Sequence, residues 1–240
     1  MMEDEKISAG SYDLNTWLYG GYEKDIISMI VGPPGSGKTN LCLLVTCSQA
    51  RKGNKVLFID TEGGFSTTRI KQIVEEDYEK VLSNILLLKP INFVEQKKIL
   101  LDLPKKIKKE HISLIVIDGM AMLYRLELGD AVQSKDEELI KGVNRDVAHQ
   151  MRALAEISRK ERIPIIITNQ VYSLFAKGEE RKTDTHLVGG DLFRYWSKCI
   201  IELQNENGKK KAILLKHRSQ PKKEFNFEIR NKGIYRKRWI

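Results

Sequence analysis

The chain has 240 residues, of which 41% are hydrophobic and 30% charged, and this composition excludes a fibrous or low-complexity protein. No apolar run approaches the roughly twenty residues of a membrane-spanning helix, and the acidic N-terminus lacks the apolar stretch of a signal peptide. We therefore expect a cytoplasmic protein that does not contact the membrane. The net charge of +9 is unevenly distributed, because residues 208–240 carry +10 and the remainder carries −1. This basic segment favours a polyanionic partner such as nucleic acid, and a solvated lysine-rich edge is the alternative.

The hydrophobic pattern predicts strands and helices that alternate from residue 26 to residue 170. A short helical lead-in with Leu14, Trp17 and Leu18 comes first. Strands are then expected at 25–32, 55–60, 84–88, 112–119 and 164–170, and helices at 40–51, 66–82, 92–111 with a kink or end at Pro104, and 135–163. Beyond residue 197, the segments 198–217 and 224–239 are predicted to form two hairpins.

This order of elements predicts an α/β fold: a mostly parallel central sheet with helices on both faces and antiparallel C-terminal strands. We expect one domain over residues 1–240, with 1–25 as a short lead-in and no N-terminal DNA-binding domain. The three cysteines, Cys42, Cys47 and Cys199, have no C-x-x-C spacing, so we expect reduced thiols in the core.

A phosphate-binding loop follows the first predicted strand of the sheet. The eight residues fit the pattern G-x-x-x-x-G-K-[ST], and they are Gly32, Pro33, Pro34, Gly35, Ser36, Gly37, Lys38 and Thr39. The glycines let successive N–H groups point into one concavity, the lysine adds a positive charge, and the Thr39 hydroxyl suits Mg²⁺. We also place Asn40, where the next helix is predicted to begin, among the nucleotide-binding residues. A simple Gly-Pro surface turn is the alternative.

Polar residues end three further predicted strands, where ligands of a parallel sheet gather. Asp118 is expected to hold Mg²⁺ together with Thr39, although a turn-capping role is the alternative. Glu62, on a strand that we expect beside the strand of the phosphate loop, is the candidate to orient or deprotonate an attacking water, and a salt-bridged loop residue is its alternative. Gln170 can sense the γ-phosphate or serve as a hydrogen-bonding core residue.

Six sequence blocks together resemble the RecA/RadA recombinase family of P-loop ATPases, and the likeness is greatest to archaeal members. They are GPPGSGKT, LFIDTEGGF, LIVIDGMAMLYR, IPIIITNQV, LVGGDLFRYWS and KHRS. The resemblance implies a RecA-like core that uses ATP and Mg²⁺. It implies catalytic roles for Lys38, Glu62 and Gln170, and it implies that Arg69 approaches the adenine. It further implies that Lys216 and Arg218 act as lysine and arginine fingers, in cis or in a neighbouring subunit.

The same resemblance implies two DNA-binding loops, the first beginning at Arg125 and the second spanning 171–187. The second loop carries Lys177, Arg181 and Lys182, but its charge is neutral, so it offers phosphates little net attraction. The C-terminal segment, with Arg236, Lys237 and Arg238 interleaved with Tyr235 and Trp239, is the stronger candidate for single strands. For Tyr235, packing on the core is the alternative.

These features together predict an accessory protein of homologous recombination and DNA repair that binds ATP and DNA, with weak ATPase activity and no strand exchange of its own. The partners that the resemblance implies are single-stranded or branched DNA and a RadA-type recombinase, with a Holliday-junction nuclease and a homo-oligomer as further candidates. The alternative is a regulatory module or signalling ATPase that uses ATP as a conformational ligand, without a nucleic-acid role.

Overall fold

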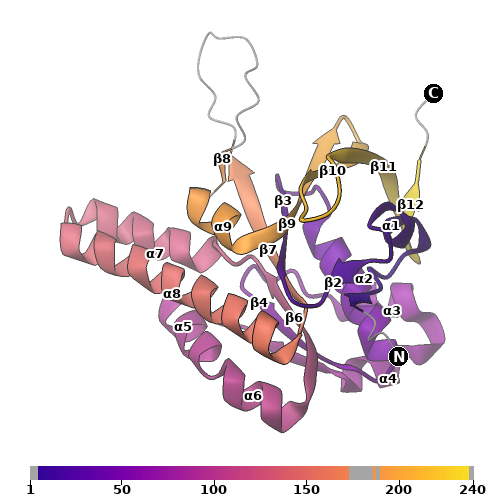
Figure 1. Cartoon of the computed structure of the whole chain (residues 1–240), viewed down its shortest axis with the longest axis horizontal. Coiled ribbons are helices and arrows are strands. Elements are labelled where there is room, and N and C mark those ends of the chain that lie inside the picture. Colours follow the sequence, from indigo (N-terminus) through magenta and orange to yellow (C-terminus); the bar gives the residue numbers. More distant parts are fainter. Residues whose placement is uncertain (1–4, 173–185, 188–189, 238–240) are drawn as a thin grey trace.

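The computed structural model describes residues 5–172, 186–187 and 190–237 (Figure 1). In chain order, the strands are β1 (Lys6–Ile7), β2 (Tyr22–Glu23), β3 (Ile27–Gly32), β4 (Lys55–Asp60), β5 (Ile85–Leu88), β6 (Ile112–Asp118), β7 (Ile165–Tyr172), β8 (His186–Leu187), β9 (Ser197–Glu206), β10 (Lys209–Lys216), β11 (Lys223–Arg230) and β12 (Gly233–Arg236). The helices are α1 (Tyr12–Trp17), α2 (Lys38–Arg51), α3 (Thr67–Val74), α4 (Tyr78–Ser83), α5 (Phe93–Leu101), α6 (Leu103–Glu110), α7 (Met122–Gln133), α8 (Glu137–Glu161) and α9 (Gly190–Trp196), with a 3-10 turn η1 (Glu75–Asp77) between α3 and α4.

The main sheet has the strand order β12-β11-β10-β9-β3-β7-β6-β4-β5, and β8 pairs with β7. The strands from β9 through β3 to β5 run parallel, whereas β10, β11 and β12 are antiparallel to their neighbours. The predicted α/β fold, with a mostly parallel sheet and antiparallel C-terminal strands, is therefore confirmed. Parallel strands that are covered on both faces explain the nearly continuous apolar runs in the sequence.

Each face of the sheet carries its own hydrophobic core, and Figure 1 shows helices on both sides. Because successive side chains of a strand point to opposite faces, Ile30 of β3 belongs to the core under α1 to α4, whereas Met29 and Val31 belong to the core under α5 to α9. The three cysteines are free and buried, as expected. None of the helices that the structure describes is long and apolar enough to cross a membrane.

Several predicted elements differ from the structure. The expected helix 66–82 is interrupted, because Glu75 adopts φ 51° after α3 and the chain passes through η1 before α4. The helix after the phosphate loop begins at Lys38, two residues before its predicted start. Two helices, α7 and α9, were not predicted. The break at Pro104 is confirmed, since α5 ends at Leu101 and the proline lies in the first turn of α6.

Candidate nucleotide site

The phosphate loop connects β3 to α2 at the carboxyl end of the parallel strands. We expect positive φ values at Gly32, Gly35 and Gly37, and Gly35 and Gly37 have them, at 73° and 110°, whereas Gly32 is the last residue of β3 and does not. Gly37 is also the N-cap of α2, so the unpaired N–H groups of the first helical turn lie at the loop. Their partial positive charge favours an anion at this position.

Lys38 lies at the mouth of the loop and is only 7% exposed. Its ammonium donates hydrogen bonds to the carbonyl oxygens of Gly32, at 2.9 Å, and Pro33, at 3.1 Å. Burial lowers the pKa of Lys38, and the nearby carboxylates of Glu62 and Asp118 partly oppose that effect. The loop therefore holds a positive charge that is poorly solvated, and a phosphate would stabilise it.

Asp118, at the end of β6, is 1% exposed and is held by one strong contact. Its Oδ1 accepts a hydrogen bond from Thr168 Oγ1 at 2.8 Å. Burial raises the pKa of Asp118; the hydroxyls of Thr39 and Thr168 act in the opposite direction. The Thr39 hydroxyl lies near enough to Asp118 to lower its pKa. Among the described residues, however, no donor forms a hydrogen bond with the buried Oδ2 of Asp118.

The space beside these two oxygens is kept open by Gly64. A Cβ atom at this position would lie 3.2 Å from Thr39 Oγ1 and 3.4 Å from Asp118 Oδ2. A hydroxyl and a buried carboxylate oxygen without a donor are the ligands that a hard cation such as Mg²⁺ prefers. The residues present therefore fit a magnesium–nucleotide complex.

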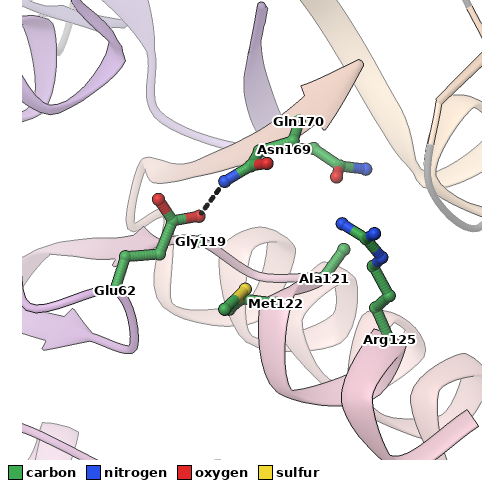
Figure 2. Close-up of a pocket in the computed structure, with 7 residues that line it drawn as sticks. All are labelled: Glu62, Gly119, Ala121, Met122, Arg125, Asn169 and Gln170. Atoms are coloured by element: carbon green, nitrogen blue, oxygen red, sulfur yellow. Dashed lines mark hydrogen bonds between the residues drawn. The ribbon is translucent and has the colours of Figure 1, made fainter. Parts of the chain in front are cut away.

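Glu62 is positioned by the short loop that follows β4. The Asp60 carboxylate accepts hydrogen bonds from the backbone N–H groups of Gly64, at 3.0 Å, and Phe65, at 3.1 Å, and so fixes the curvature of the loop. Thr61 Oγ1 donates to the carbonyl oxygen of Gly119 at 2.8 Å. These contacts direct the Glu62 side chain across the end of β6 (Figure 2).

The Glu62 carboxylate faces Gln170, as Figure 2 shows, and Gln170 Nε2 donates a hydrogen bond to Glu62 Oε1 at 3.2 Å. Burial and the charge of Asp118 raise the pKa of Glu62, whereas Gln170 and Lys38 work against this rise. A side chain at Gly119 would collide with the Glu62 carboxylate. Glu62 is thus a carboxylate with raised proton affinity, which is the property expected of a general base.

The strand order corrects one step of the sequence argument. We expected the strand of Glu62 beside the strand of the phosphate loop, but β7 and β6 lie between β3 and β4. Gln170 is the residue on the neighbouring strand, where it pairs with Gly32 across the β3–β7 ladder. Glu62 nevertheless reaches the site, because its loop bends back over the end of β6.

A small pocket lies between the Glu62–Gln170 pair and Arg125 (Figure 2). It is lined by Glu62, Gly119, Ala121, Met122, Arg125, Asn169 and Gln170. Arg125 belongs to helix α7, so the expectation that a loop begins at this residue is wrong. Its contact with DNA stays a prediction.

Arg69, predicted to approach the adenine, lies next to Asn40 at the start of α2. Its Nε donates to Asn40 Oδ1 at 2.9 Å, and its two terminal nitrogens donate to Gln72 Oε1 and to the carbonyl oxygens of Arg230 and Asn231, at 2.8 to 3.0 Å. The guanidinium is therefore held by hydrogen bonds from its three nitrogens. Asn40 and Arg69 thus lie together at the edge of the phosphate loop.

Lys216 and Arg218 lie away from their own phosphate loop. Arg218 bonds Asp25 through both terminal nitrogens, at 3.0 and 2.9 Å, and its Nε lies 2.9 Å from Glu23 Oε2. Asp25 precedes β3, whereas the phosphate loop follows that strand. Lys216 Nζ donates to the carbonyl oxygen of Arg194 in α9 at 2.7 Å. The fold therefore does not bring either cation to the site in cis.

The remaining predicted DNA contacts divide into described and undescribed residues. Lys177, Arg181, Lys182 and Arg238 lie outside the described residues. The backbone N–H of Arg236 donates to Asp13 Oδ2 at 2.8 Å, and Lys237 Nζ lies 3.2 Å from Glu228 Oε2. Tyr235 is 36% exposed and its ring lies under the Arg230 guanidinium, 5.1 Å from it.

Sequence reasoning did not identify the residues that hold Asp118 and the loop of Glu62 in position. Thr168 donates to Asp118 and accepts a hydrogen bond from Gly119 N at 3.0 Å, so one hydroxyl joins β7 to the end of β6. Asp60 and Thr61 shape the loop of Glu62. The only signal in the sequence was their place at strand ends.

Comparison with known proteins gives a family for this arrangement. Residues 3–237 match the model of the Rad51 family. A protein of Methanobrevibacter smithii called "DNA repair and recombination protein RadB" is 38% identical over 237 residues, which cover 97% of this chain and 96% of that protein. Proteins with the same name from Methanocaldococcus jannaschii and Methanothermobacter thermautotrophicus are 39% and 35% identical, over 90% and 92% of this chain and 96% and 91% of their own lengths. The resemblance inferred from the sequence blocks is confirmed, and the chain belongs to the Rad51 family.

Proposed function

We propose that this chain is an ATP- and DNA-binding accessory protein of homologous recombination and DNA repair. It hydrolyses ATP weakly and acts as a mediator or regulator of a RadA-type recombinase, without carrying out strand exchange itself. The observation that carries the proposal is the convergence of Lys38, Thr39, Asp118, Glu62 and Gln170 at one rim of the sheet. The name of the relatives, DNA repair and recombination protein, supports the biological setting.

In this proposal, different residues of the site bind the phosphates, hold the metal and activate the water. Lys38 and the N–H groups of the loop bind the phosphates, and Thr39 with Asp118 would hold Mg²⁺, which neutralises phosphate charge. Glu62 orients the attacking water and accepts its proton. Gln170 connects the state of that carboxylate to β7, the strand that leads toward the predicted second DNA-binding loop.

Weak turnover is supported by the positions of the two candidate fingers. Arg218 is bound by Asp25 and Glu23 beyond the amino end of β3, and Lys216 is bound to the backbone of α9. A single copy therefore lacks those cations at the phosphates, where they would stabilise transition-state charge. A second subunit, or a recombinase partner, would have to supply them.

One titration tests the proposal. Labelled single-stranded DNA is titrated with the chain in the presence and absence of ATP and Mg²⁺, beside Lys38→Ala. We expect binding that weakens steeply with salt, because phosphate contacts release counterions, and an ATP effect that the variant loses. If the chain fails to bind DNA at any salt concentration, or if Lys38→Ala binds ATP normally, the proposal is overturned.

A second function is favoured by the Glu62–Gln170 hydrogen bond, because it engages the carboxylate oxygen that would otherwise accept a proton from water. A regulatory module could bind ATP as a conformational ligand and leave it unhydrolysed. Glu62→Gln separates the two functions. Unchanged turnover in this variant, together with a persistent effect of ATP on partner or DNA affinity, would favour the module; a large loss of turnover would favour the ATPase.

A further inference from the structure

Segments from the two ends of the chain lie side by side where α1 packs on the β11–β12 hairpin (Figure 1). Ser11 Oγ donates to the carbonyl oxygen of Ile234 at 2.6 Å, and the N–H of Arg236 donates to Asp13 Oδ2 at 2.8 Å. These bonds satisfy polar groups along the outer edge of β12. Between α1 and the hairpin lies a hollow whose lining includes Asp13, Trp17, Tyr19, Lys223, Glu224 and Arg236.

Aromatic rings form the floor and part of the rim of this hollow. The Trp17 ring stacks on Phe225 with centroids 5.6 Å apart and is almost fully buried, so it forms the floor. Tyr19 stands at the rim with 60% of its surface exposed. The Lys223 ammonium lies 3.7 Å from the centroid of Tyr19 and 5.8 Å from that of Trp17. A cation is therefore held against exposed aromatic surface.

The backbone of Tyr19 is held in place by its neighbours. It adopts φ 53°, and its carbonyl oxygen accepts a hydrogen bond from Lys6 Nζ at 2.9 Å. The following turn is anchored as well, since a side chain at Gly21 would collide with the backbone of Ile7. An exposed ring on a fixed backbone loses less conformational entropy when it binds a planar group than a ring on a flexible segment would.

Among the described residues, the Lys223 ammonium at the hollow has no carboxylate within 4.0 Å. Burial and repulsion from Lys6 lower the pKa of Lys223, and in the described part of the chain Lys6 has no carboxylate within that distance either. The two carboxylates of the lining have other partners than Lys223: Asp13 accepts a hydrogen bond from the backbone N–H of Arg236, and Glu224 lies 3.4 Å from Lys211. An anion at Lys223 would relieve the repulsion between the two ammonium groups.

We propose that this hollow is a binding site for single-stranded nucleic acid, in which a base stacks on the face of the Tyr19 ring opposite the Lys223 ammonium and an adjacent phosphate lies between Lys223 and Arg236. The inference rests on the proposed function and names a surface for its DNA contact. Unpaired bases expose the faces that an exposed aromatic ring can stack on, whereas duplex bases are covered by their neighbours. The mixture of ring and cation therefore favours a single strand over a duplex and over an acidic peptide, which would have no planar group for Tyr19.

The test is fluorescence anisotropy of a labelled oligothymidylate with Tyr19→Asn, Tyr19→Phe and Lys223→Gln. Asparagine tolerates the positive φ at this position, so Tyr19→Asn removes the ring without straining the backbone. We expect about tenfold weaker binding for Tyr19→Asn and an affinity like that of the unaltered protein for Tyr19→Phe. Lys223→Gln should bind less tightly and reduce the salt slope by about one. Lys109→Gln, an exposed lysine of α6, is the control and should match the unaltered protein.

The outcomes separate this inference from the function on which it rests. Affinity for ATP should be unchanged in every variant, and melting temperatures check that each variant is folded. If the unaltered protein does not bind the oligonucleotide, the proposed function fails and this site fails with it. If the unaltered protein binds while Tyr19→Asn and Lys223→Gln bind equally well, only the site is overturned. Competition by polyglutamate that depends on Tyr19 would also overturn it, because the hollow would then be a peptide site.

Discussion

Gln170 Nε2 donates a hydrogen bond to Glu62 Oε1 at 3.2 Å, and this contact joins the strand beside the phosphate loop to the loop that follows β4. The two residues are 108 positions apart, and β6 lies between their strands. The charges of Asp118 and Lys38 also act on Glu62, so the pKa of its carboxylate depends on the candidate metal ligand and on the lysine of the phosphate loop. The role of nucleotide sensor that we propose for Gln170 would act through this hydrogen bond.

Glu62→Gln should lower ATP turnover by about a hundredfold or more, since the amide cannot accept a proton from water. Nucleotide affinity should not fall, because the substitution removes a negative charge near the phosphates. Phosphate release and a fluorescent-nucleotide titration measure the two effects. Glu79→Gln, an exposed glutamate of α4, is the matched control. Turnover equal in both variants would rule out the role of general base.

The pH dependence of turnover should report the environment of Glu62. Its pKa is raised by burial and by Asp118, so the active carboxylate is lost at a higher pH than the ordinary 4.5 as acid is added. Gln170→Leu removes a hydrogen bond that lowers this pKa, and the acidic limb of the rate profile should move further toward neutral pH. Rates measured across the acid range test this. A limb that moves to lower pH in the variant would contradict the assignment.

The sequence predicted the features that are local. The phosphate loop is contiguous, and strands such as Ile112–Asp118 are apolar runs that can be read without knowing their neighbours. The helix α7 was missed because its pattern is weak, with Leu126 and Val132 both about half exposed. The break in the helix 66–82 was missed because Glu75 takes a positive φ that no glycine or proline marks.

The arrangement of the site was harder to predict, because its supports are distant in sequence. Thr168 bonds to Asp118 across 50 positions, and nothing in either segment specifies which strands are neighbours. For this reason the sequence placed Glu62 correctly at a strand end but placed its strand wrongly beside β3. The positions of Lys216 and Arg218 relative to the phosphate loop likewise depend on the antiparallel return of β10.

Gly64→Ala should weaken Mg²⁺-dependent nucleotide binding by about tenfold, because the added methyl group would crowd both oxygens of the candidate metal site. Calorimetric titration of ATP with and without Mg²⁺ distinguishes this effect from a general loss of affinity. Gly129→Ala is the control, since a Cβ there meets open space on α7 and should stabilise the fold by up to about 1 kcal/mol. A Gly64→Ala variant with unchanged Mg²⁺ dependence would show that the metal does not lie beside Thr39 and Asp118.

Arg218→Met should destabilise the fold by about 2 kcal/mol, because it removes charged hydrogen bonds to Asp25 and leaves the buried carboxylate of Glu23 without its guanidinium. Arg159→Met, an exposed arginine of α8, should change stability by no more than about 0.5 kcal/mol. Urea unfolding at neutral pH measures both values. A stability like that of the unaltered protein would mean that Arg218 is free to act elsewhere, as a finger in a neighbouring subunit requires.

The effect of Arg218→Met on the free energy of unfolding should also depend on pH in the acid range. Arg218 holds the pKa of Asp25 below its ordinary 3.8, so this pair stabilises the fold above that pH and the contribution is lost as the pH falls through the lowered value. The gap in unfolding free energy between the unaltered protein and Arg218→Met should therefore be constant above about pH 5 and shrink below it. Unfolding curves at a series of pH values test this sign. A gap that grows in acid would mean that another group, and not the Asp25–Arg218 pair, dominates the stability of this end of the sheet.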